Sequence, residues 1–376
     1  MGAASSFLFS LLGIGSPPAT FITFTSYWGF SNQLQELKVA ANWARYTGRT
    51  LVLPRWAHSR DPQSLEPETC TSLNHLCEPL ARLVDVPRLR EFIDVEIAQE
   101  HHAQNDSKFV VEFGVDFRTK ENRMKYLVRW MSDEPGMLVQ DSYFRTKSTP
   151  PGAPPMWCHS GLLVSPYRCM RSAHELSRRT ETTIHFPRFS TFQVGKLWSG
   201  NAGRRAELNA AVDGFVRPSR SVFRIADRVL AELELMRRGY DAIHVRRGDF
   251  LNTSWARVGD LSDRGKALFD AVSNGPAFAS SKASRVIVFV ATDDEEYIER
   301  EGRERLKAAG YRHVVTWPKR FHNSVSPLSR SLAEQLICAR ARMFAAQKGS
   351  TWSTYVEMLR SRPELLQDAR GRDDDL

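Results

Sequence analysis

The segment FITFTSYWGFSNQLQELKVAANWARYTGRTLVLP, residues 21–54, decides the fold. Its first five residues, Phe21–Thr25, are apolar or β-branched, which predicts a buried strand. After a glycine-containing loop, Leu34–Gly48 has the spacing of an amphipathic helix that ends at its glycine. Thr50–Pro54 is a second apolar run, stopped by proline. Strand, loop, helix and strand form a βαβ unit, the building block of a parallel, doubly wound sheet.

The alternation of strand-like and helix-like segments returns after about residue 205. Strand-like runs occur at Tyr240–Val245, Arg285–Ala291 and His313–Trp317, and helix-like runs at Ser221–Arg238, Glu295–Gly310 and Ser331–Ala346. Strands that alternate with helices of this length are typical of a second parallel sheet.

The region between these two patterns, residues 57–200, is rich in proline. Its strand-like pieces, at Lys108–Phe113 and Met137–Gln140, are short enough to extend the first sheet. The sequence therefore predicts an α/β protein with two doubly wound, Rossmann-like domains. We expect these domains at 20–204 and 205–362, followed by a frayed tail at 363–376.

The composition is that of a globular protein with a basic surface. The chain has 376 residues, 42% of them hydrophobic, and a formal net charge of +9. Such a charge attracts nucleic acid, anionic membranes or phosphorylated small molecules. The arginines are scattered in pairs rather than gathered in a tract, which disfavours nucleic acid. A phosphate-bearing ligand is the preferred interpretation, and an ordinary soluble basic surface is the alternative.

Cysteine spacing bears on the compartment. Cys70 lies close to Cys77, and Cys158 lies close to Cys169, whereas Cys338 falls inside a helix-like segment. Two short-range disulfides and one buried thiol fit an oxidising compartment, but free thiols in a cytosolic protein remain open. We expect the lumen of the endoplasmic reticulum or Golgi, and two glycosylation sequons, at Asn105 and Asn252, favour it in a glycoprotein.

The N-terminus allows two interpretations. Residues 7–15, FLFSLLGIG, have the length of a signal-peptide core without a basic region before it, and they are too short to span a bilayer. The opening MGAASS also fits a myristoylation pattern. No other segment approaches a transmembrane span, so we expect no integral membrane segment.

Polar residues follow three strand-like or loop segments of the second domain: His244–Asp249, Ala291–Asp294 and Gly349–Ser353. Ligands of open α/β sheets collect at the carboxyl ends of the strands. Side chains alternate along a strand, so His244 and Arg246 share a face that Arg247 does not. A guanidinium there can bind phosphate oxygens in a bidentate manner. A structural ion pair between an arginine and Asp249 is the alternative.

The other two segments are equally open to structural roles. The stretch GSTWS, at Gly349–Ser353, precedes a helix-like segment, so it is either an anion cradle or an ordinary helix cap. Asp293 and Asp294 can bind a metal, cap the helix that begins at Glu295, or read the edge of a base. A pair of aspartates after a strand usually caps a helix.

Four segments, in this order and spacing, resemble the GDP-fucose-dependent O-fucosyltransferase family. They are GFSNQ with TGRTLVLP in the first domain, IHVRRGDF at Ile243–Phe250, VFVATDD at Val288–Asp294, and EQLICARARMFAAQKGSTWS at Glu334–Ser353. The match covers about residues 20–55 and 238–360, and the second half is most similar to the branch that fucosylates thrombospondin-type repeats. Each segment is loose by itself, but four in register are specific.

The resemblance implies a GT-B-like fold, with two domains facing a cleft and GDP-fucose held mainly by the C-terminal domain. Arg246 would then hold the β-phosphate of the donor. Asn32, in the first-domain loop with Gly29 and Phe30, would face the fucose and the acceptor. Arg246 and Asn32 are thus the implied catalytic residues.

Further donor contacts follow from the same resemblance. His244 and Asp293 would read the ribose or the guanine edge. The residues that would close over the diphosphate are Ser350, Thr351, Trp352 and Ser353. Stabilising the leaving phosphate with guanidinium and amide donors needs neither a metal nor a cofactor. The implied partners are GDP-fucose and a protein or glycan acceptor, not nucleic acid.

The chain departs from the branch pattern at three positions. Trp28 stands where the branch has a glutamate, its proposed base. Glu334 replaces the usual aspartate, and Trp352 replaces phenylalanine, which keeps an aromatic lid. Glu36, in the first helix, can substitute as the base or be an ordinary helix residue. The sequence therefore predicts an inverting fucosyltransferase acting on a hydroxyl acceptor; a non-catalytic member that binds a nucleotide sugar or a partner is the alternative.

Overall fold

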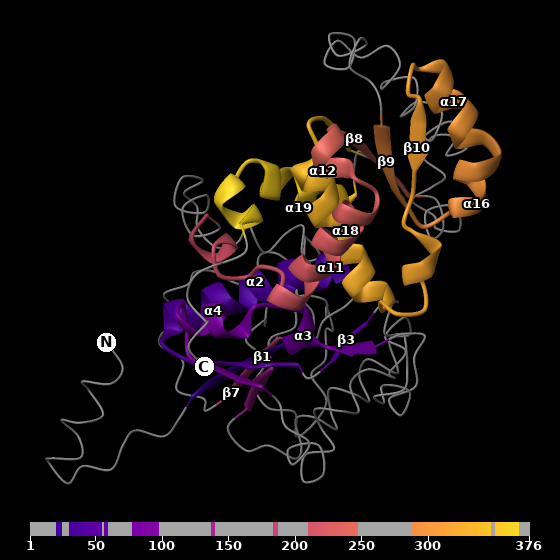
Figure 1. Ribbon diagram of the computed structural model, residues 1–376. Helices are drawn as coiled ribbons and strands as arrows, with labels where there is room; N and C mark the ends of the chain where they lie inside the picture. The colour runs from indigo at the N-terminus through magenta and orange to yellow at the C-terminus, as the bar shows by residue number, and fades with distance from the viewer. Residues whose placement is uncertain are drawn as a thin grey trace, which may run out of the picture. The chain divides into compact units, whose positions relative to one another are not determined.

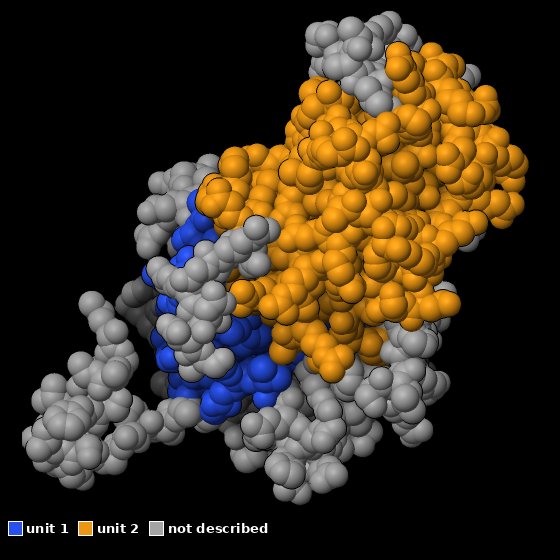
Figure 2. Space-filling view, viewed as in Figure 1, with its two compact units in different colours: residues 1–71, 86–216 blue, residues 72–85, 217–376 orange. Residues whose placement is uncertain are grey.

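The structure, a computed structural model, consists of two compact units (Figure 2). Unit 1 comprises residues 1–71 and 86–216, and unit 2 comprises residues 72–85 and 217–376. The residues it describes are 20–24, 30–54, 56–58, 77–97, 137–139, 183–186, 210–246, 287–346 and 350–367. The predicted domain boundary between residues 204 and 205 stays a prediction, because residues 187–209 lie outside the described part.

In its described part, unit 1 is built on a five-stranded parallel sheet with the order β5-β2-β1-β7-β6. The strands are β1 (Phe21–Phe24), β2 (Thr50–Leu53), β5 (Val95–Ile97), β6 (Met137–Val139) and β7 (Thr183–Phe186). Helix α2 (Phe30–Thr47) connects β1 to β2 and packs against both (Figure 1). The βαβ unit predicted for residues 21–54 is therefore confirmed.

The core of this sheet lies on its central strands. Ile22 of β1 pairs with Leu51 on one side and with Ile184 on the other. Ile22 and Leu51 are fully buried. Gly48 ends α2 with φ of +67°, a left-handed conformation that glycine adopts without strain. Helix α2 begins at Phe30 rather than at the expected Leu34, and the predicted strand at Met137–Gln140 is present as β6.

Unit 2 contains, within its described residues, a four-stranded parallel sheet with the order β10-β9-β8-β11. Its strands are β8 (Asp241–Val245), β9 (Ile287–Thr292), β10 (His313–Val315) and β11 (Phe344–Ala345). The chain runs from β8 outward through β9 to β10, and then returns to the far side of β8. The order of the strands thus reverses between β8 and β11, and such a switch point is where open α/β sheets bind their ligands.

Helices cover both faces of this second sheet (Figure 1). Helices α16 (Glu295–Tyr297) and α17 (Arg303–Ala308) lie on one side, and α18 (Pro327–Arg340) and α19 (Thr351–Arg360) lie on the other. Ile243 and Val245 of β8 belong to the apolar cluster that contains Tyr297 and Leu306 of the first pair. Because side chains alternate along a strand, His244 points to the opposite face, toward α18 and α19.

Two predicted helices of unit 2 have different bounds. The run Ser221–Arg238 forms α11 (Arg220–Glu232) and α12 (Leu235–Arg238), broken at Glu234, whose φ is +51°. The run Ser331–Ala346 is wrong at both ends, because α18 spans Pro327–Arg340 and β11 follows it.

The start of α18 is fixed by a cap: the Ser326 hydroxyl accepts a hydrogen bond from Ser329 N at 3.1 Å, with Pro327 at the first helical position. Its end is fixed by Arg360, whose Nη1 donates to the Ala339 carbonyl at 3.2 Å. Phe344 is then free to pair with Ala242 of β8.

A short segment far from the rest of unit 2 in sequence supports α18. It contains β4 (Cys77–Pro79) and α3 (Leu80–Leu83). The Ser329 hydroxyl donates to the Glu78 carboxylate at 2.9 Å, and the Ser326 hydroxyl bonds the same carboxylate. Arg217 pairs with Asp85 at 2.8 Å. These contacts connect the N-terminus of α18 and the start of α11 to residues that precede them by more than a hundred positions.

The beginning of the predicted frayed tail is ordered. Pro363–Leu366 form a 3₁₀ turn, η9, and Leu365 is buried. Arg340 Nη2 donates to the Leu366 carbonyl at 3.1 Å, and this contact holds the turn against α18. The expectation of a frayed tail from residue 363 is therefore wrong for its first residues, while 368–376 lie outside the described part.

Cys77 is disulfide-bonded, and Cys338 is a buried free thiol. Cys70, Cys158 and Cys169 lie outside the described residues, so the predicted pairings stay predictions. The segments Phe7–Gly15 and Lys108–Phe113 and the two sequons also lie outside them. Among the helices that the structure describes, none has the length and apolar character needed to cross a membrane.

Candidate active site

Strand β8 delivers His244 and Arg246 to the switch point of the second sheet. All five residues of the strand are buried, and His244 is 5% exposed. Arg246 follows directly after the strand and is half-buried, and its charge contributes to the pKa of His244. The end of the buried strand thus brings an imidazole and a guanidinium close enough to influence each other.

Helix α19 begins shortly after β11, the strand on the other side of the switch point. Its cap residue, Ser350, and the next three residues, Thr351–Ser353, are all buried. The Ser350 hydroxyl makes no hydrogen bond, although an ordinary cap would accept one from the first turn. The first turn of any helix carries amide donors without an intrahelical partner. A buried hydroxyl beside such donors suits an anion better than an ordinary helix cap.

His244 is fixed by two consecutive residues of α19. Its Nδ1 lies 2.8 Å from the hydroxyl of Ser353, in hydrogen-bond contact. Its ring stacks on the indole of Trp352, with 3.9 Å between ring centroids and 25° between planes. Burial, with a smaller contribution from the Arg246 charge, lowers the pKa of His244 from 6.5 to about 3. The imidazole is therefore neutral at physiological pH, and its Nε2 can offer one donor or one acceptor.

Trp352 is itself held by helix α18. Its Nε1 donates to the hydroxyl of Ser331 at 3.0 Å, and its carbonyl accepts a hydrogen bond from Gln335 Nε2 at 3.2 Å. The side chain is 8% exposed. The structure thus gives Trp352 the geometry of an internal platform under His244 and not that of an exposed lid.

The carboxyl end of β9 carries Asp293 and Asp294, which have different environments. Asp294 caps α16, because its Oδ1 accepts a hydrogen bond from Tyr297 N at 2.9 Å. Its own N–H donates to the Thr292 hydroxyl at 3.0 Å. The capping alternative is therefore confirmed for Asp294. Asp293 is exposed at the tip of this turn, where a ligand can reach it.

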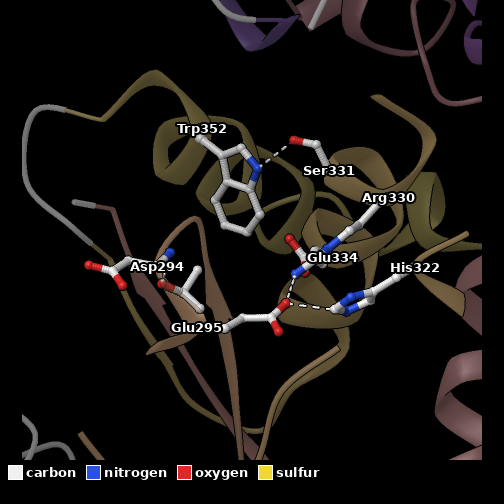
Figure 3. A network of polar contacts seen from close by, with 8 residues as sticks. Asp294, Glu295, His322, Arg330, Ser331, Glu334 and Trp352 are labelled. Carbon is white, nitrogen blue, oxygen red and sulfur yellow. Dashed lines mark hydrogen bonds and ion pairs between the residues drawn. The ribbon is translucent and has the colours of Figure 1, made fainter. Parts of the chain in front are cut away.

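Arg330, Glu295, Glu334 and His322 form a polar network beside this turn (Figure 3). Arg330 of α18 donates through Nη2 to Glu295 Oε1 at 2.6 Å and through Nε to Glu334 Oε1 at 3.0 Å. His322 Nε2 lies 3.3 Å from the same oxygen of Glu295. Arg330 thereby joins the start of α16, next to Asp293, to the middle of α18.

Glu334 is the most perturbed acid of this network. Burial raises the pKa of Glu334 from 4.5 to about 7, against the lowering effect of the Arg330 charge and hydrogen bond. The negative charges of Glu295 and Asp293 raise this pKa further. The carboxyl group therefore changes its charge close to neutral pH, next to the turn that carries Asp293.

In unit 1, the predicted acceptor-side residues lie at the start of α2. Phe30 is its first residue and is buried, and Asn32 is half-buried. Asn32 Oδ1 is buried and makes no hydrogen bond. Glu36, one turn later, is fully buried. Trp28 and Gly29 lie outside the described residues, as do Arg247 and Asp249 of the second unit.

Sequence reasoning named Glu334 only as a replaced position of the family pattern, and it missed its partner Arg330 and the residues of α18 that hold Trp352. For the pair of Arg330 and Glu334 a signal was available, because an arginine and a glutamate at positions i and i+4 pair on one helix face. For Ser331 and Gln335 there was none, since their partner, Trp352, lies about 20 residues further along the chain. Only the packing of α18 against α19 brings them together.

Three comparisons relate this chain to known proteins. The sequence profile of the family described as GDP-fucose protein O-fucosyltransferase matches residues 21–362. The structure of POFUT1 in complex with GDP is 13% identical, with a TM-score of 0.50, over 92% of this chain and 96% of that chain. The apo form of POFUT1 has the same identity and TM-score, 13% and 0.50, over 93% and 97%.

The fucosyltransferase NodZ from Bradyrhizobium is 14% identical, with a TM-score of 0.47, over 91% of this chain and 94% of that chain. None of the curated proteins matches the chain. At such low identity, the likeness to POFUT1 shows the fold alone, and it agrees with the α/β, GT-B-like class predicted from the sequence. The family profile covers nearly the whole chain, including every strand of both sheets. This chain therefore belongs to the GDP-fucose protein O-fucosyltransferase family and is a GDP-fucose-dependent fucosyltransferase.

Proposed function

We propose that this enzyme transfers fucose from GDP-fucose, with inversion at the anomeric carbon, to the hydroxyl of a serine or threonine in a protein. The observation that carries the donor side is the convergence of His244, Arg246 and the start of α19 at the switch point of the second sheet. A nucleoside diphosphate needs cationic and amide donors for its phosphates and a polar edge for its base or sugar. This point of the fold supplies both.

Arg246 is the residue that stabilises the leaving group. Its guanidinium binds the β-phosphate in a bidentate manner, and this contact strengthens as negative charge builds on the departing GDP. The amides at the start of α19, with the hydroxyls of Ser350, Thr351 and Ser353, hold the other phosphate oxygens. The buried Ser350 hydroxyl, which makes no hydrogen bond in the structure, supports this role.

His244 and Asp293 bind the nucleoside. A neutral imidazole fits this task, because it hydrogen-bonds a ribose hydroxyl or a guanine edge without adding a buried charge. The exposed carboxylate of Asp293 accepts hydrogen bonds from hydroxyl or amino groups. Trp352 acts through the orientation of His244.

In the transfer step, the bond between the anomeric carbon and the β-phosphate oxygen breaks, and the acceptor oxygen forms a new bond to that carbon from the opposite face. The electron pair of the broken bond leaves with GDP, and the acceptor hydroxyl loses its proton. Asn32, with Gly29 and Phe30, faces the fucose and the acceptor. The free Oδ1 of Asn32 supports this assignment, since a buried amide oxygen without a partner is costly unless a ligand pairs with it.

The proton of the acceptor hydroxyl can leave by two routes. The position of the branch's glutamate is Trp28 in this chain. Either Glu36 accepts the proton, or a loose, oxocarbenium-like transition state lets a weakly activated hydroxyl attack. The two routes differ in their effect on Glu36→Gln, which removes turnover only on the first.

The test follows GDP release from GDP-fucose, with and without folded protein acceptors that carry exposed serine and threonine residues. We expect acceptor-dependent GDP release that survives chelation of divalent metals. Arg246→Ala is the negative control, and Arg237→Ala, at an exposed pair with Glu234, is the matched arginine control. Tight GDP-fucose binding without GDP release on any acceptor would instead favour a non-catalytic, donor-binding member of the family.

We further propose that the enzyme works in the lumen of the endoplasmic reticulum or Golgi. The disulfide at Cys77 supports this assignment, because structural disulfides persist in oxidising compartments. Mass analysis of the chain from its native source, under non-reducing conditions, tests it. A free thiol at Cys77 contradicts the luminal location.

A further inference from the structure

The ring of His244 has two fixed contacts, and both come from α19. Ser353 sets the rotation of the imidazole through Nδ1, at 2.8 Å, and Trp352 sets its plane by stacking at 3.9 Å. Together these contacts determine where Nε2 points. Anything that fixes the indole of Trp352 therefore also fixes the direction of Nε2, the ring nitrogen that the Ser353 hydroxyl does not contact.

The indole is fixed by a residue of α18 that no part of the proposed mechanism uses. Ser331 accepts the Nε1–H of Trp352 at 3.0 Å, across the packed pair of helices α18 and α19 (Figure 3). An indole has a single N–H donor, so this contact restrains the ring through its only polar atom. Gln335, one turn along α18, donates to the Trp352 carbonyl at 3.2 Å and fixes the backbone of the same residue.

We propose that Ser331 is a positioning residue of the donor site, which orients His244 by holding the Trp352 indole through its N–H. The assignment of the ligand as GDP-fucose rests on the function proposed above, but the orientation of His244 does not.

A purely structural role is the alternative to this proposal. A buried indole N–H usually finds an acceptor, and the contact then only stabilises the helix pair. The two roles predict different results. A structural contact contributes to the free energy of unfolding and leaves His244 unchanged. A positioning contact also keeps water away from His244, so its loss changes the titration of that imidazole.

The direction of that change follows from the cause of the low pKa. Burial is the larger cause of the lowered pKa of His244, and the Arg246 charge is the smaller one. Of the groups that face the imidazole, Trp352 and Ser353 carry no charge near neutral pH and Arg246 stays charged. If the indole moves, water reaches the ring, the burial effect weakens and the pKa of His244 rises toward its ordinary value.

The experiment compares four forms of the full chain: the wild type, Ser331→Ala, Ser331→Thr and Trp352→Phe. Ser331→Ala removes the acceptor, and Ser331→Thr restores a hydroxyl. Trp352→Phe keeps a stacking ring but removes the N–H. Ser361→Ala is the matched control, because Ser361 also makes one hydrogen bond, to the Met358 carbonyl at 2.7 Å, at the far end of α19.

The first readout is the NMR titration of the His244 ring without ligand, assigned by comparison with His244→Gln. We expect no titration between pH 5 and 8 in the wild type and the Ser361→Ala control. In Ser331→Ala and Trp352→Phe, the titration of His244 moves into this pH range, and in Ser331→Thr it returns to the wild-type behaviour. If the His244 titration in Ser331→Ala equals that of the wild type, the proposal is wrong.

The second readout is the KM for GDP-fucose. Loss of one net hydrogen bond predicts a rise of about 2- to 10-fold in Ser331→Ala, with a smaller change in kcat. Ser331→Ala combined with Trp352→Phe should add nothing to either single change, because both remove the same contact. An additive loss in the double variant overturns the proposal. If the wild type neither binds nor turns over GDP-fucose, the proposed function fails, but the NMR titration still decides the role of Ser331.

Discussion

The ends of β8 and β9 lie on neighbouring parallel strands of one sheet, yet their environments are opposite. His244, at the end of β8, is buried by uncharged groups of α19, and this burial, with a smaller contribution from the Arg246 charge, holds it neutral. The end of β9 lies beside a network of charges, in which Arg330 bridges Glu295 and Glu334. The comparison teaches that one edge of a sheet can have a fixed charge state at the end of one strand, β8, and a charge that changes near neutral pH beside the next, β9.

The different partners of the two strand ends explain this contrast. The first turn of α19 covers β8 with an indole and small hydroxyls, which exclude water without bringing charge. Arg330 of α18 lies beside the turn after β9. Its guanidinium pairs with Glu334 of the same helix and with Glu295 at the start of α16. Fixed donors suit a diphosphate, whereas the network at the end of β9 joins α16 to α18 through a carboxyl group that titrates near neutral pH.

The largest effect is expected at the β8 end, for Arg246→Ala. Losing a charge-assisted contact that strengthens in the transition state costs about 3–4 kcal/mol, or roughly a hundred- to thousand-fold in kcat. Arg246→Lys should fail almost as badly, because an ammonium group does not reproduce the bidentate contact. Steady-state rates of GDP release measure both variants.

The variant of the next residue, Arg247→Ala, tests the orientation proposed for the two arginines. Arg247 lies outside the described residues, and the sequence pattern predicts it on the face opposite to Arg246, so we expect an effect on stability rather than on turnover. If Arg247→Ala abolishes turnover in a well-folded protein while Arg246→Ala preserves it, the orientation proposed for this strand end is wrong.

The second prediction concerns the β9 end. Arg330→Ala leaves the buried Glu334 without its cation and also releases Glu295. Breaking a buried pair on one side costs about 3 kcal/mol of unfolding free energy. Arg237→Ala, at a pair whose side chains are 75% and 53% exposed, should leave the unfolding free energy almost unchanged. Denaturant unfolding of both variants at pH 8 gives the comparison, and equal losses would show that Arg330 behaves as a surface arginine.

The third prediction is the pH dependence of this network. Glu334 has a pKa of about 7 in the folded chain against 4.5 as its ordinary value. Between these pH values the folded state keeps a proton that the unfolded state has released, so the free energy of unfolding falls as pH rises and the loss is complete above about 7. From pH 5.5 to 7.5 this loss is about 2 kcal/mol.

Glu334→Gln removes this titration, so its unfolding free energy should be nearly flat over the same range. The stability of the variant relative to the wild type should then increase with pH. Denaturant titrations of both proteins at several pH values measure the difference. If the unfolding free energies of the two proteins change in parallel with pH, another group is responsible for the titration. The ends of β8 and β9 would then no longer differ in this respect.

Much of this arrangement is predictable from the sequence. The apolar runs and the glycine at 48 locate the first βαβ unit, and the buried run before Arg246 locates β8 with His244 inside it. These inferences succeed because each depends on neighbours within a few residues. The ligand edge of the second sheet, and the place of Arg246 on it, stay predictions.

The remainder depends on contacts between distant residues. Strand β7, between β1 and β6, has four residues and no pattern that separates it from the loops around it. The start of α18 depends on a cap at Ser326 and on Glu78, more than 240 positions earlier. The neutral state of His244 and the raised pKa of Glu334 come from burial, which only the folded chain determines.

The smallest predicted effect separates the two aspartates after β9. Asp294 caps α16 through Tyr297 N at 2.9 Å, whereas Asp293 is exposed toward the ligand edge. Asp294→Ala should cost about 1 kcal/mol of unfolding free energy, the usual contribution of a cap, and Asp294→Asn should recover most of it. Asp294 has no ligand role in the proposed mechanism. The KM for GDP-fucose should therefore change less in Asp294→Asn than in Asp293→Asn. Denaturant unfolding and steady-state kinetics on the three variants test this division, and a larger KM effect for Asp294→Asn than for Asp293→Asn would exchange their roles.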